Sequence, residues 1–192
     1  KIINENIEII IVDDGSNDNT QNILKKNNNF TIIRNEINKG KGASIKRAIK
    51  SACNQNIILI DGDLEIDLND IPWLIDKYEK SNNDVLTGIR WNKYSQFKLE
   101  INTIGNYLIN ALFNLLYKTK FSDVLCCLKI LDINLIKSLN IRSNGFNIEI
   151  ETMAKLVLKK SKIEEVDINY TRRSINDGKK LKISDGWGII WS

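Results

Sequence analysis

The stretch that decides the fold is ILIDGDLEID, residues 58–67, where an apolar run of strand length ends in closely spaced carboxylates. The acidic residues occupy every second position: Asp61, Asp63, Glu65 and Asp67. Residues two apart on an extended segment face the same way, so we expect Asp61 and Asp63 to present oxygen to one hard cation, with Gly62 allowing a ligand to approach closely. The alternative is a solvated acidic turn.

Around this stretch, apolar runs of strand length alternate with helical patterns, which predicts βαβ units on a mostly parallel sheet. The expected strands are Ile7–Val12, Thr31–Ile33, Ile57–Ile60 and Asp84–Ile89. Apolar residues at i, i+3, i+4 and i+7 from Ile45 predict one helix, and Asp70 as an N-cap before Pro72 predicts the start of another. The first half of the chain therefore predicts an α/β fold.

The second half of the sequence is richer in helical patterns. Apolar spacing predicts a long helix over Ile101–Tyr117 and another from Ile150 to Leu158. Short strands over Leu125–Leu131 and Ile163–Tyr170 are expected to join the edge of the sheet, where an antiparallel orientation is open to them. No repeat or linker divides the chain, so we expect a single domain over residues 1–192.

Both ends of the sequence indicate a truncated domain. Residues 1–6 resemble the tail of a helix, and SDGWGIIWS at residues 184–192 resembles a helix start that stops at once. An open α/β sheet normally begins with a strand, and no strand is expected before Ile7–Val12. We therefore expect the N-terminal strand of the fold to be missing.

The composition narrows the chemistry. The chain has 192 residues, of which 42% are hydrophobic and 27% charged, and it contains no histidine. The lack of histidine excludes Ser/His/Asp hydrolysis, Cys/His proteolysis and most zinc catalysis. Three cysteines give neither a disulfide framework nor metal-ligand spacing, and we interpret them as packing residues. A net charge of +4 favours an anionic partner at one face and does not indicate nucleic-acid binding.

Two further motifs lie where an open α/β sheet binds ligands. IIIVDDGSNDNT, residues 9–20, places Asp13, Asp14, Gly15 and Ser16 after a buried strand. NKGKGAS, residues 38–44, places glycines and lysines before a helix N-terminus, where amides and the helix dipole favour phosphate. The alternatives are a solvated turn for the first motif and a tight turn beneath solvated lysines for the second.

Seven motifs in order resemble glycosyltransferase family 2, specifically its polyprenyl-phosphate (dolichol-phosphate) mannosyl- and glucosyltransferases. They are VDDGSNDNT, NKGKGASIKRAIKSA, IILIDGDLE, VLTGIR, FSDVLCCLKIL, RSNGFNIEIETMAKL and YTRRSINDGKKLKISDGW. The resemblance covers nearly the whole chain. It implies a GT-A fold and a metal-dependent enzyme that moves a sugar from a nucleotide-diphosphate sugar to a lipid phosphate with inversion.

The resemblance also assigns roles to residues. It implies a DxD metal site for Mg²⁺ or Mn²⁺ at Asp61 and Asp63, and a catalytic group of Asp63, Arg90 and Arg173. The residues implied to bind the nucleotide sugar are Asp13, Asp14, Gly15, Ser16, Lys41, Gly42, Asp61 and Gly62. Those implied to meet the acceptor phosphate are Arg90, Asp123, Lys129, Arg173, Lys179 and Lys180. Glu149 and Glu151 match a helix start of the family, while Leu125, Cys127, Leu128 and Asn176 depart from its pattern on the acceptor side.

A phosphate acceptor suits a chain without histidine. A hydroxyl acceptor needs a general base, whereas a phosphate monoester is already an anionic nucleophile at neutral pH. We therefore expect transfer of a hexose, from a donor of the GDP-mannose or UDP-glucose class, to polyprenyl phosphate. The alternatives are a family member with a hydroxyl acceptor, where Asp123 or Glu151 would act as base, and a catalytically silent nucleotide-sugar-binding module.

The expected location is the cytoplasm, on the cytoplasmic face of a membrane. No apolar run reaches the length of about 18 residues that a membrane span needs. The C-terminal Trp187 and Trp191 flank a short apolar stretch, which favours contact with the membrane interface. For the long helix at Ile101–Tyr117 we expect burial in the core.

Overall fold

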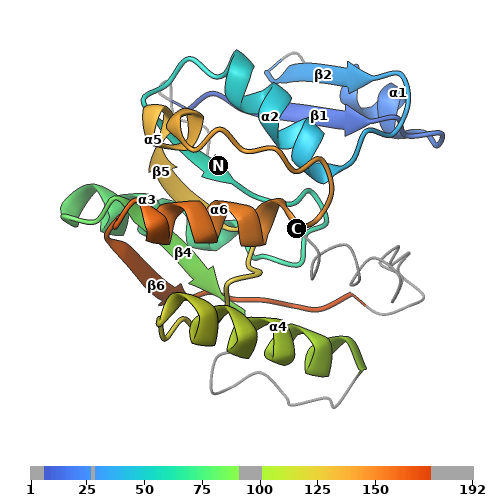
Figure 1. Ribbon diagram of the computed structural model, residues 1–192. Coiled ribbons are helices and arrows are strands. Elements are labelled where there is room, and N and C mark those ends of the chain that lie inside the picture. The colour runs from blue at the N-terminus through green and yellow to red at the C-terminus, as the bar shows by residue number, and fades with distance from the viewer. Residues whose placement is uncertain (1–6, 27–28, 91–100, 174–192) are drawn as a thin grey trace.

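The structure is a computed structural model that describes residues 7–26, 29–90 and 101–173. Its elements form stacked layers of sheet and helix (Figure 1). The strands are β1 (Ile10–Asp14), β2 (Thr31–Asn35), β3 (Asn56–Leu59), β4 (Val85–Ile89), β5 (Lys129–Asp132) and β6 (Ile163–Asp167). The helices are α1 (Thr20–Leu24), α2 (Lys41–Ser51), α3 (Ile71–Lys80), α4 (Ile101–Tyr117), α5 (Ile133–Ser138) and α6 (Ile148–Leu158), with a 3₁₀ turn at Leu68–Asp70.

The strands form two sheets within the described residues. β1 and β2 pair in parallel, and the larger sheet has the order β3-β5-β4-β6. β5 runs antiparallel to both of its neighbours, whereas β4 and β6 are parallel. The sheet is thus more mixed than expected, and β5 lies inside it, not at its edge. Its burial explains the difference, because Lys129, Ile130 and Leu131 are all buried and a strand buried on both faces belongs in the interior.

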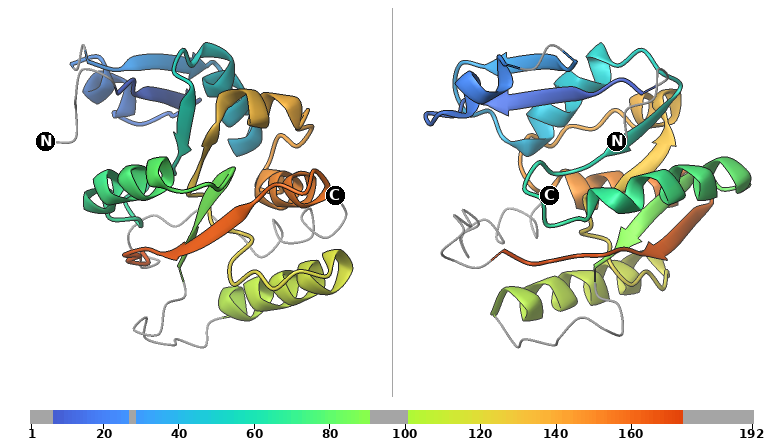
Figure 2. Two further views of the ribbon diagram at one scale, coloured as in Figure 1. Left: turned by 90° about the vertical axis from the view of Figure 1, so that its left-hand side faces the viewer. Right: turned by 180° about the vertical axis from the view of Figure 1, so that it is seen from behind.

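Helices cover both faces of the larger sheet (Figure 2). Val85 and Leu131 pack with Met153 of α6 and Phe113 of α4 in one cluster of buried side chains. Their chain neighbours, Leu86 and Ile130, pack with Leu74 of α3 in a second cluster. This alternation is the two-residue period of a strand, and it gives the domain a hydrophobic core on each side of the sheet.

Helix starts are only partly as expected. α3 follows Asp70, but the Asp70 side chain does not cap it. The carboxylate is buried and accepts hydrogen bonds from the backbone N and Nδ2 of Asn169 instead, at 2.7 and 2.9 Å. Asp70 therefore ties the start of α3 to the segment after β6.

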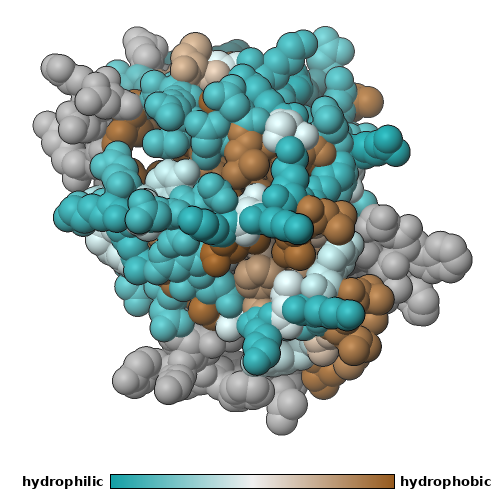
Figure 3. Space-filling view, turned by 60° about the vertical axis from the view of Figure 1, so that its left-hand side comes forward, coloured by the Kyte–Doolittle hydropathy of each residue, from teal (hydrophilic) through white to brown (hydrophobic). Residues whose placement is uncertain are grey.

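The long helix α4 is mostly exposed on one side, which corrects the expectation that it belongs to the core. Phe113 is buried, whereas Leu108, Leu115 and Leu116 are 65%, 75% and 67% exposed. Figure 3 shows hydrophobic side chains gathered at the lower right of the molecule, over this helix. Among the residues that the structure describes, no helix is both long and apolar enough to cross a membrane.

Candidate active site

The acidic segment after β3 is a turn, which corrects the extended geometry expected from its alternating carboxylates. Leu64 has a φ of 61°, in the left-handed region that non-glycine residues seldom adopt. Within the protein, Asp61 contacts the ammonium of Lys41 and Asp63 contacts the guanidinium of Arg173. Both carboxylates are partly exposed, and a Cβ added at Gly62 would meet no atom within 4 Å, so a ligand can reach the segment.

Asp61 begins a row of four alternating charges that runs into the protein. The ammonium of Lys41 lies 2.8 and 2.9 Å from the two carboxylate oxygens of Asp61. The same ammonium lies 2.8 Å from Oε1 of Glu149, whose Oε2 accepts a hydrogen bond from Lys129 Nζ at 2.7 Å. Burial alone would lower the pKa of Lys41, but the two carboxylates outweigh it and raise this pKa. Lys41 is therefore a permanent positive charge beside Asp61.

Asp63 belongs to a second charged group, formed with the segment after β6. Arg173 donates from a guanidinium nitrogen to Asp63 Oδ2 at 3.1 Å, and its backbone N donates to Glu65 Oε1 at 3.1 Å. The Tyr170 hydroxyl donates to the other oxygen of Glu65. Burial, followed by the hydrogen bond to Glu65, raises the pKa of Tyr170. Arg173 is thus held next to Asp63 and Glu65.

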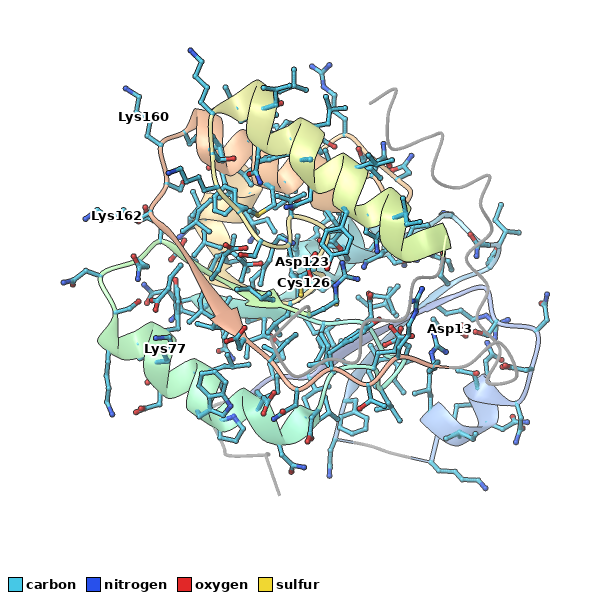
Figure 4. The ribbon with its side chains drawn as sticks, turned by 90° about the horizontal axis from the view of Figure 1, so that it is seen from below. Asp13, Lys77, Asp123, Cys126, Lys160 and Lys162 are labelled. Carbon is cyan, nitrogen blue, oxygen red and sulfur yellow. The ribbon has the colours of Figure 1, made fainter. Side chains whose placement is uncertain are left out.

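Arg90, at the end of β4, is fixed by Asp123. Its Nε and one terminal nitrogen donate to the two oxygens of Asp123, at 2.7 and 2.8 Å, and its backbone N donates to Oδ2 at 3.1 Å. Its guanidinium carbon also lies 5.8 Å from the centre of the Tyr170 ring, within the range of a cation–π contact. Figure 4 shows Asp123 beside Cys126 near the centre of the molecule. The two-pronged pair leaves Arg90 little freedom to turn.

The motif after β1 contains two carboxylates, Asp13 and Asp14, that differ in their hydrogen bonds. Asp14 accepts hydrogen bonds from the backbone N of Lys39 and of Gly40, at 2.9 and 2.8 Å, and from Asn35. Burial raises its pKa, but these hydrogen bonds outweigh that effect and lower it. Asp13 is buried, its Oδ1 accepts from the backbone N of Ser16 at 2.9 Å, and its Oδ2 has no hydrogen-bond partner. Asp14 thus shapes the loop, whereas Oδ2 of Asp13 is buried and lies 4.0 Å from a guanidinium nitrogen of Arg34.

The glycine-rich loop before α2 packs against protein. A Cβ at Gly40 or Gly42 would lie 2.4 Å from the carbonyl oxygen of Asn144 or Ser143, respectively. The Asn144 carbonyl also accepts a hydrogen bond from the backbone N of Ala43 at 3.1 Å. The glycines therefore permit a close approach of two backbone segments. This packing fits the interpretation of the motif as a tight turn better than its interpretation as an open phosphate-binding loop.

Two residues implied to meet the acceptor phosphate, Lys129 and Asp123, are buried within the protein. Lys129 is 0% exposed because β5 lies inside the sheet. Its Nζ donates a hydrogen bond to the Cys126 carbonyl as well as to Glu149. Asp123 is 2% exposed and fully engaged with Arg90. Arg90 and Arg173 stay partly exposed, whereas Lys179, Lys180 and Trp187 lie outside the described residues.

Sequence reasoning missed the two residues that connect the site. Glu149 matched a family helix start, but nothing in its local sequence showed that it pairs with Lys41 and Lys129. Glu65 stood in the alternating acidic series and received no role, although it holds both Arg173 and Tyr170. For Glu65, the sequence signal was its place in the alternating acidic series. For Glu149, the signal was a glutamate in the first turn of a largely apolar helix.

Solved structures share this fold. Glucosyl-3-phosphoglycerate synthase from Mycobacterium tuberculosis, in complex with Mn²⁺, uridine diphosphate and glucosyl-3-phosphoglycerate, matches with a TM-score of 0.71. The match covers 95% of this chain and 66% of that one, at 16% sequence identity. At this identity the likeness establishes the fold, which is GT-A.

Sequence relatives extend the likeness beyond the fold. The chain is 32% identical over 184 residues to an uncharacterized protein of Methanocaldococcus jannaschii, covering 88% of this chain and 80% of the relative. It is 28% identical over 171 residues to dodecaprenyl-phosphate galacturonate synthase of Rhizobium johnstonii, covering 86% of this chain and half of the relative's length. The family model of glycosyl transferase family 2 matches residues 1–139. The chain therefore belongs to glycosyl transferase family 2.

Proposed function

We propose that this glycosyltransferase moves a hexose from a nucleotide-diphosphate sugar to a polyprenyl phosphate, with inversion and with a divalent cation. A relative that is named dodecaprenyl-phosphate galacturonate synthase supports a polyprenyl-phosphate acceptor. Structural neighbours that hold Mn²⁺ with uridine diphosphate support a nucleotide donor and a metal.

The observation that carries the choice of acceptor is the state of the two candidate bases. Asp123 is buried and bound on both oxygens by Arg90. Burial raises the pKa of Glu151, but hydrogen bonds from Lys155 and from the amides of Ser143 and Arg142 outweigh it and hold this pKa at about 2. A carboxylate with so low a pKa is a poor base at neutral pH. A phosphate acceptor requires neither residue to take a proton.

The acidic pair suits a divalent cation that is shared with the donor. No group of three or more His, Cys, Asp or Glu side chains is arranged to hold a metal ion within residues 7–26, 29–90 and 101–173. Mg²⁺ usually binds through one or two carboxylates plus substrate phosphates, so Asp61 and Asp63 with a diphosphate form a sufficient set of hard oxygen ligands. The cation would supply Lewis-acid stabilisation of the departing diphosphate.

The remaining charged residues bind and orient the two substrates. Oδ2 of Asp13, which has no hydrogen-bond partner and lies 4.0 Å from a guanidinium nitrogen of Arg34, is proposed to accept a hydrogen bond from the nucleotide base. Arg90 and Arg173 lie on adjacent segments, joined through Tyr170 and Glu65, and carry permanent positive charge into the site. These guanidinium groups offset the repulsion between the donor diphosphate and the acceptor phosphate, which must lie close together for attack on the sugar.

A comparison of acceptors tests the proposal. The chain is incubated with Mn²⁺, a panel of labelled nucleotide sugars, and either a polyprenyl phosphate or the matching polyprenol. We expect labelled sugar on the phosphate alone, since the polyprenol hydroxyl would need a base. Faster transfer to the polyprenol, or to a soluble glycan, would replace this proposal with the hydroxyl-acceptor alternative.

A nucleotide-sugar-binding module is a second candidate, favoured by one observation. Asp61 and Asp63 each already contact a protein cation, Lys41 and Arg173 respectively. A pair that is neutralised in this way could bind a nucleotide sugar without turning it over. Binding of a donor without transfer to any acceptor in the panel would support that function.

Arg173 provides a test on the acceptor side. In Arg173→Ala we expect the KM for polyprenyl phosphate to rise at least about tenfold, because a charge-assisted contact to phosphate contributes about 1.5–3 kcal/mol. Arg142→Ala is the matched control, since Arg142 is an exposed arginine outside the charged group that Arg173 forms with Asp63 and Glu65. An unchanged KM for the lipid in Arg173→Ala would remove this residue from the acceptor site.

The exposed face of α4 is the part of the described structure best suited to meet a membrane surface. The helix itself lies close to Asp123, because Asn110 of α4 accepts a hydrogen bond from the backbone N of Val124. Lys118 and Lys120 follow the helix and are exposed, and Figure 4 shows Lys160 and Lys162 at the left of the view from below. An apolar face bordered by lysines is typical of a helix that lies on an anionic membrane surface.

Vesicle binding checks this role of α4. We expect a variant with Leu108, Leu115 and Leu116 changed to serine to lose at least about tenfold in affinity for vesicles with anionic lipid, because burial of each leucine contributes about 1.5–3 kcal/mol. Ile23→Ser is the control, since Ile23 is an exposed apolar residue on α1. Equal sedimentation of the triple variant and the control would show that α4 does not hold the membrane.

A further inference from the structure

Two buried residues, Glu149 and Lys129, follow Lys41 in the row of charges that begins at Asp61. We propose that their charges set the affinity of Asp61 for a divalent cation, so that both act as positioning residues for the donor site. The inference rests on the proposed function. It goes beyond it by giving an electrostatic role to residues that no substrate touches.

The four charges form a continuous row. Lys129 contacts Glu149 at 2.7 Å, Glu149 contacts Lys41 at 2.8 Å, and Lys41 contacts Asp61 at 2.8 Å. Exposure of the side chains increases along the row: 1% for Lys129, 8% for Glu149, 14% for Lys41 and 37% for Asp61. Only the Asp61 end of the row is open to a cation.

The order of signs explains why the row is needed. A lysine that contacted Asp61 alone would neutralise it and repel an incoming divalent cation. Glu149 offsets the charge of Lys41 from behind, so that Asp61 keeps its attraction for the cation. Glu149 would itself be costly to bury without a second partner, and Lys129 supplies that partner from the middle of the sheet.

This arrangement predicts effects of opposite sign for two buried substitutions. Glu149→Gln removes a negative charge behind Lys41, which makes the surroundings of Asp61 more positive and weakens cation binding. Lys129→Met removes a positive charge and strengthens it. The double variant restores the balance, because it removes one charge of each sign. Unit charges a few ångströms apart interact strongly enough in a protein interior for such changes to be measurable.

The experiment is a calorimetric titration of the 192-residue chain with uridine diphosphate, and separately with guanosine diphosphate, at a series of Mn²⁺ concentrations. We expect the Mn²⁺ concentration at half-maximal binding to rise at least about tenfold in Glu149→Gln, to fall at least about threefold in Lys129→Met, and to return close to the wild-type value in the double variant. Thermal unfolding of each variant is recorded alongside.

The experiment distinguishes the outcomes even if one of the variants does not fold. Glu149→Gln leaves Lys129 buried with the Cys126 carbonyl, so this variant is the one most prone to unfold. In that case Lys129→Met and the double variant still separate the outcomes. If both shift the Mn²⁺ requirement in the same direction, or neither shifts it, the pair has a structural role only and the inference is wrong. If wild-type protein binds neither nucleotide at any Mn²⁺ concentration, both the proposed function and this inference fail.

Discussion

Asp63→Asn should lower the rate of sugar transfer by a factor on the order of 10²–10³, the size of effect seen when one group that stabilises developing charge is removed. Asparagine keeps the shape of the side chain and a carbonyl oxygen but loses the negative charge. Without this charge the pair would hold a divalent cation less well. The guanidinium of Arg173, which contacts Asp63 at 3.1 Å in the wild-type protein, would also lose its charged partner. The transfer rate at saturating donor and acceptor is the measurement.

The control for this variant is Asp76→Asn. Asp76 is an exposed aspartate of α3 whose carboxylate contacts Lys80, four residues along the same helix, at 2.7 Å. The variant therefore loses the same charge and also breaks an ion pair, but on the exposed surface of a helix outside the acidic segment. Equal transfer rates for Asp63→Asn and Asp76→Asn would show that Asp63 takes no part in the reaction.

Asp123→Ala should have the largest effect on stability. It leaves the guanidinium of Arg90 largely buried without its carboxylate, and breaking a buried ion pair from one side costs about 3–5 kcal/mol. We expect the free energy of unfolding, measured with urea, to fall by that amount. Asp76→Ala breaks an exposed pair instead and should cost no more than about 1 kcal/mol.

A double variant separates the effect of the charges from the effect of side-chain packing at the Arg90–Asp123 ion pair. Arg90→Met with Asp123→Leu replaces both charges by apolar side chains and should recover most of the stability that Asp123→Ala loses. Its transfer rate should stay low, because Arg90 is proposed to face the substrates. If Asp123→Ala is as stable as Asp76→Ala, the ion pair does not hold the end of β4 in place.

The strands and helices were predictable because the local spacing of apolar residues indicates which side chains are buried. The apolar runs before Asp13 and Asp61 correspond to β1 and β3, and the i, i+3, i+4 pattern from Ile45 lies on α2. The direction of β5 was not predictable in this way, since a short apolar strand can pair with either orientation. Similarly, the spacing in α4 shows an apolar face but not whether protein covers it.

The charged residues of the candidate site could be picked out from the sequence, but their contacts with one another could not. The DxD pattern located Asp61 and Asp63, yet the turn at Leu64 directs them to Lys41 and Arg173, which are separated from them by 20 and 110 positions in the chain. Such pairings depend on how the elements pack. The same reason explains why a lysine in β5, expected to meet a phosphate, is instead the buried end of a row of charges.

The most direct test of the account is binding of a nucleoside diphosphate by the chain with and without Mn²⁺, for the wild-type protein and for Asp61→Asn combined with Asp63→Asn. The account predicts tight binding to wild-type protein only when Mn²⁺ is present, and loss of this dependence in the double variant. Binding that is equally tight without Mn²⁺, or unchanged in the double variant, would contradict a donor site built on these two carboxylates.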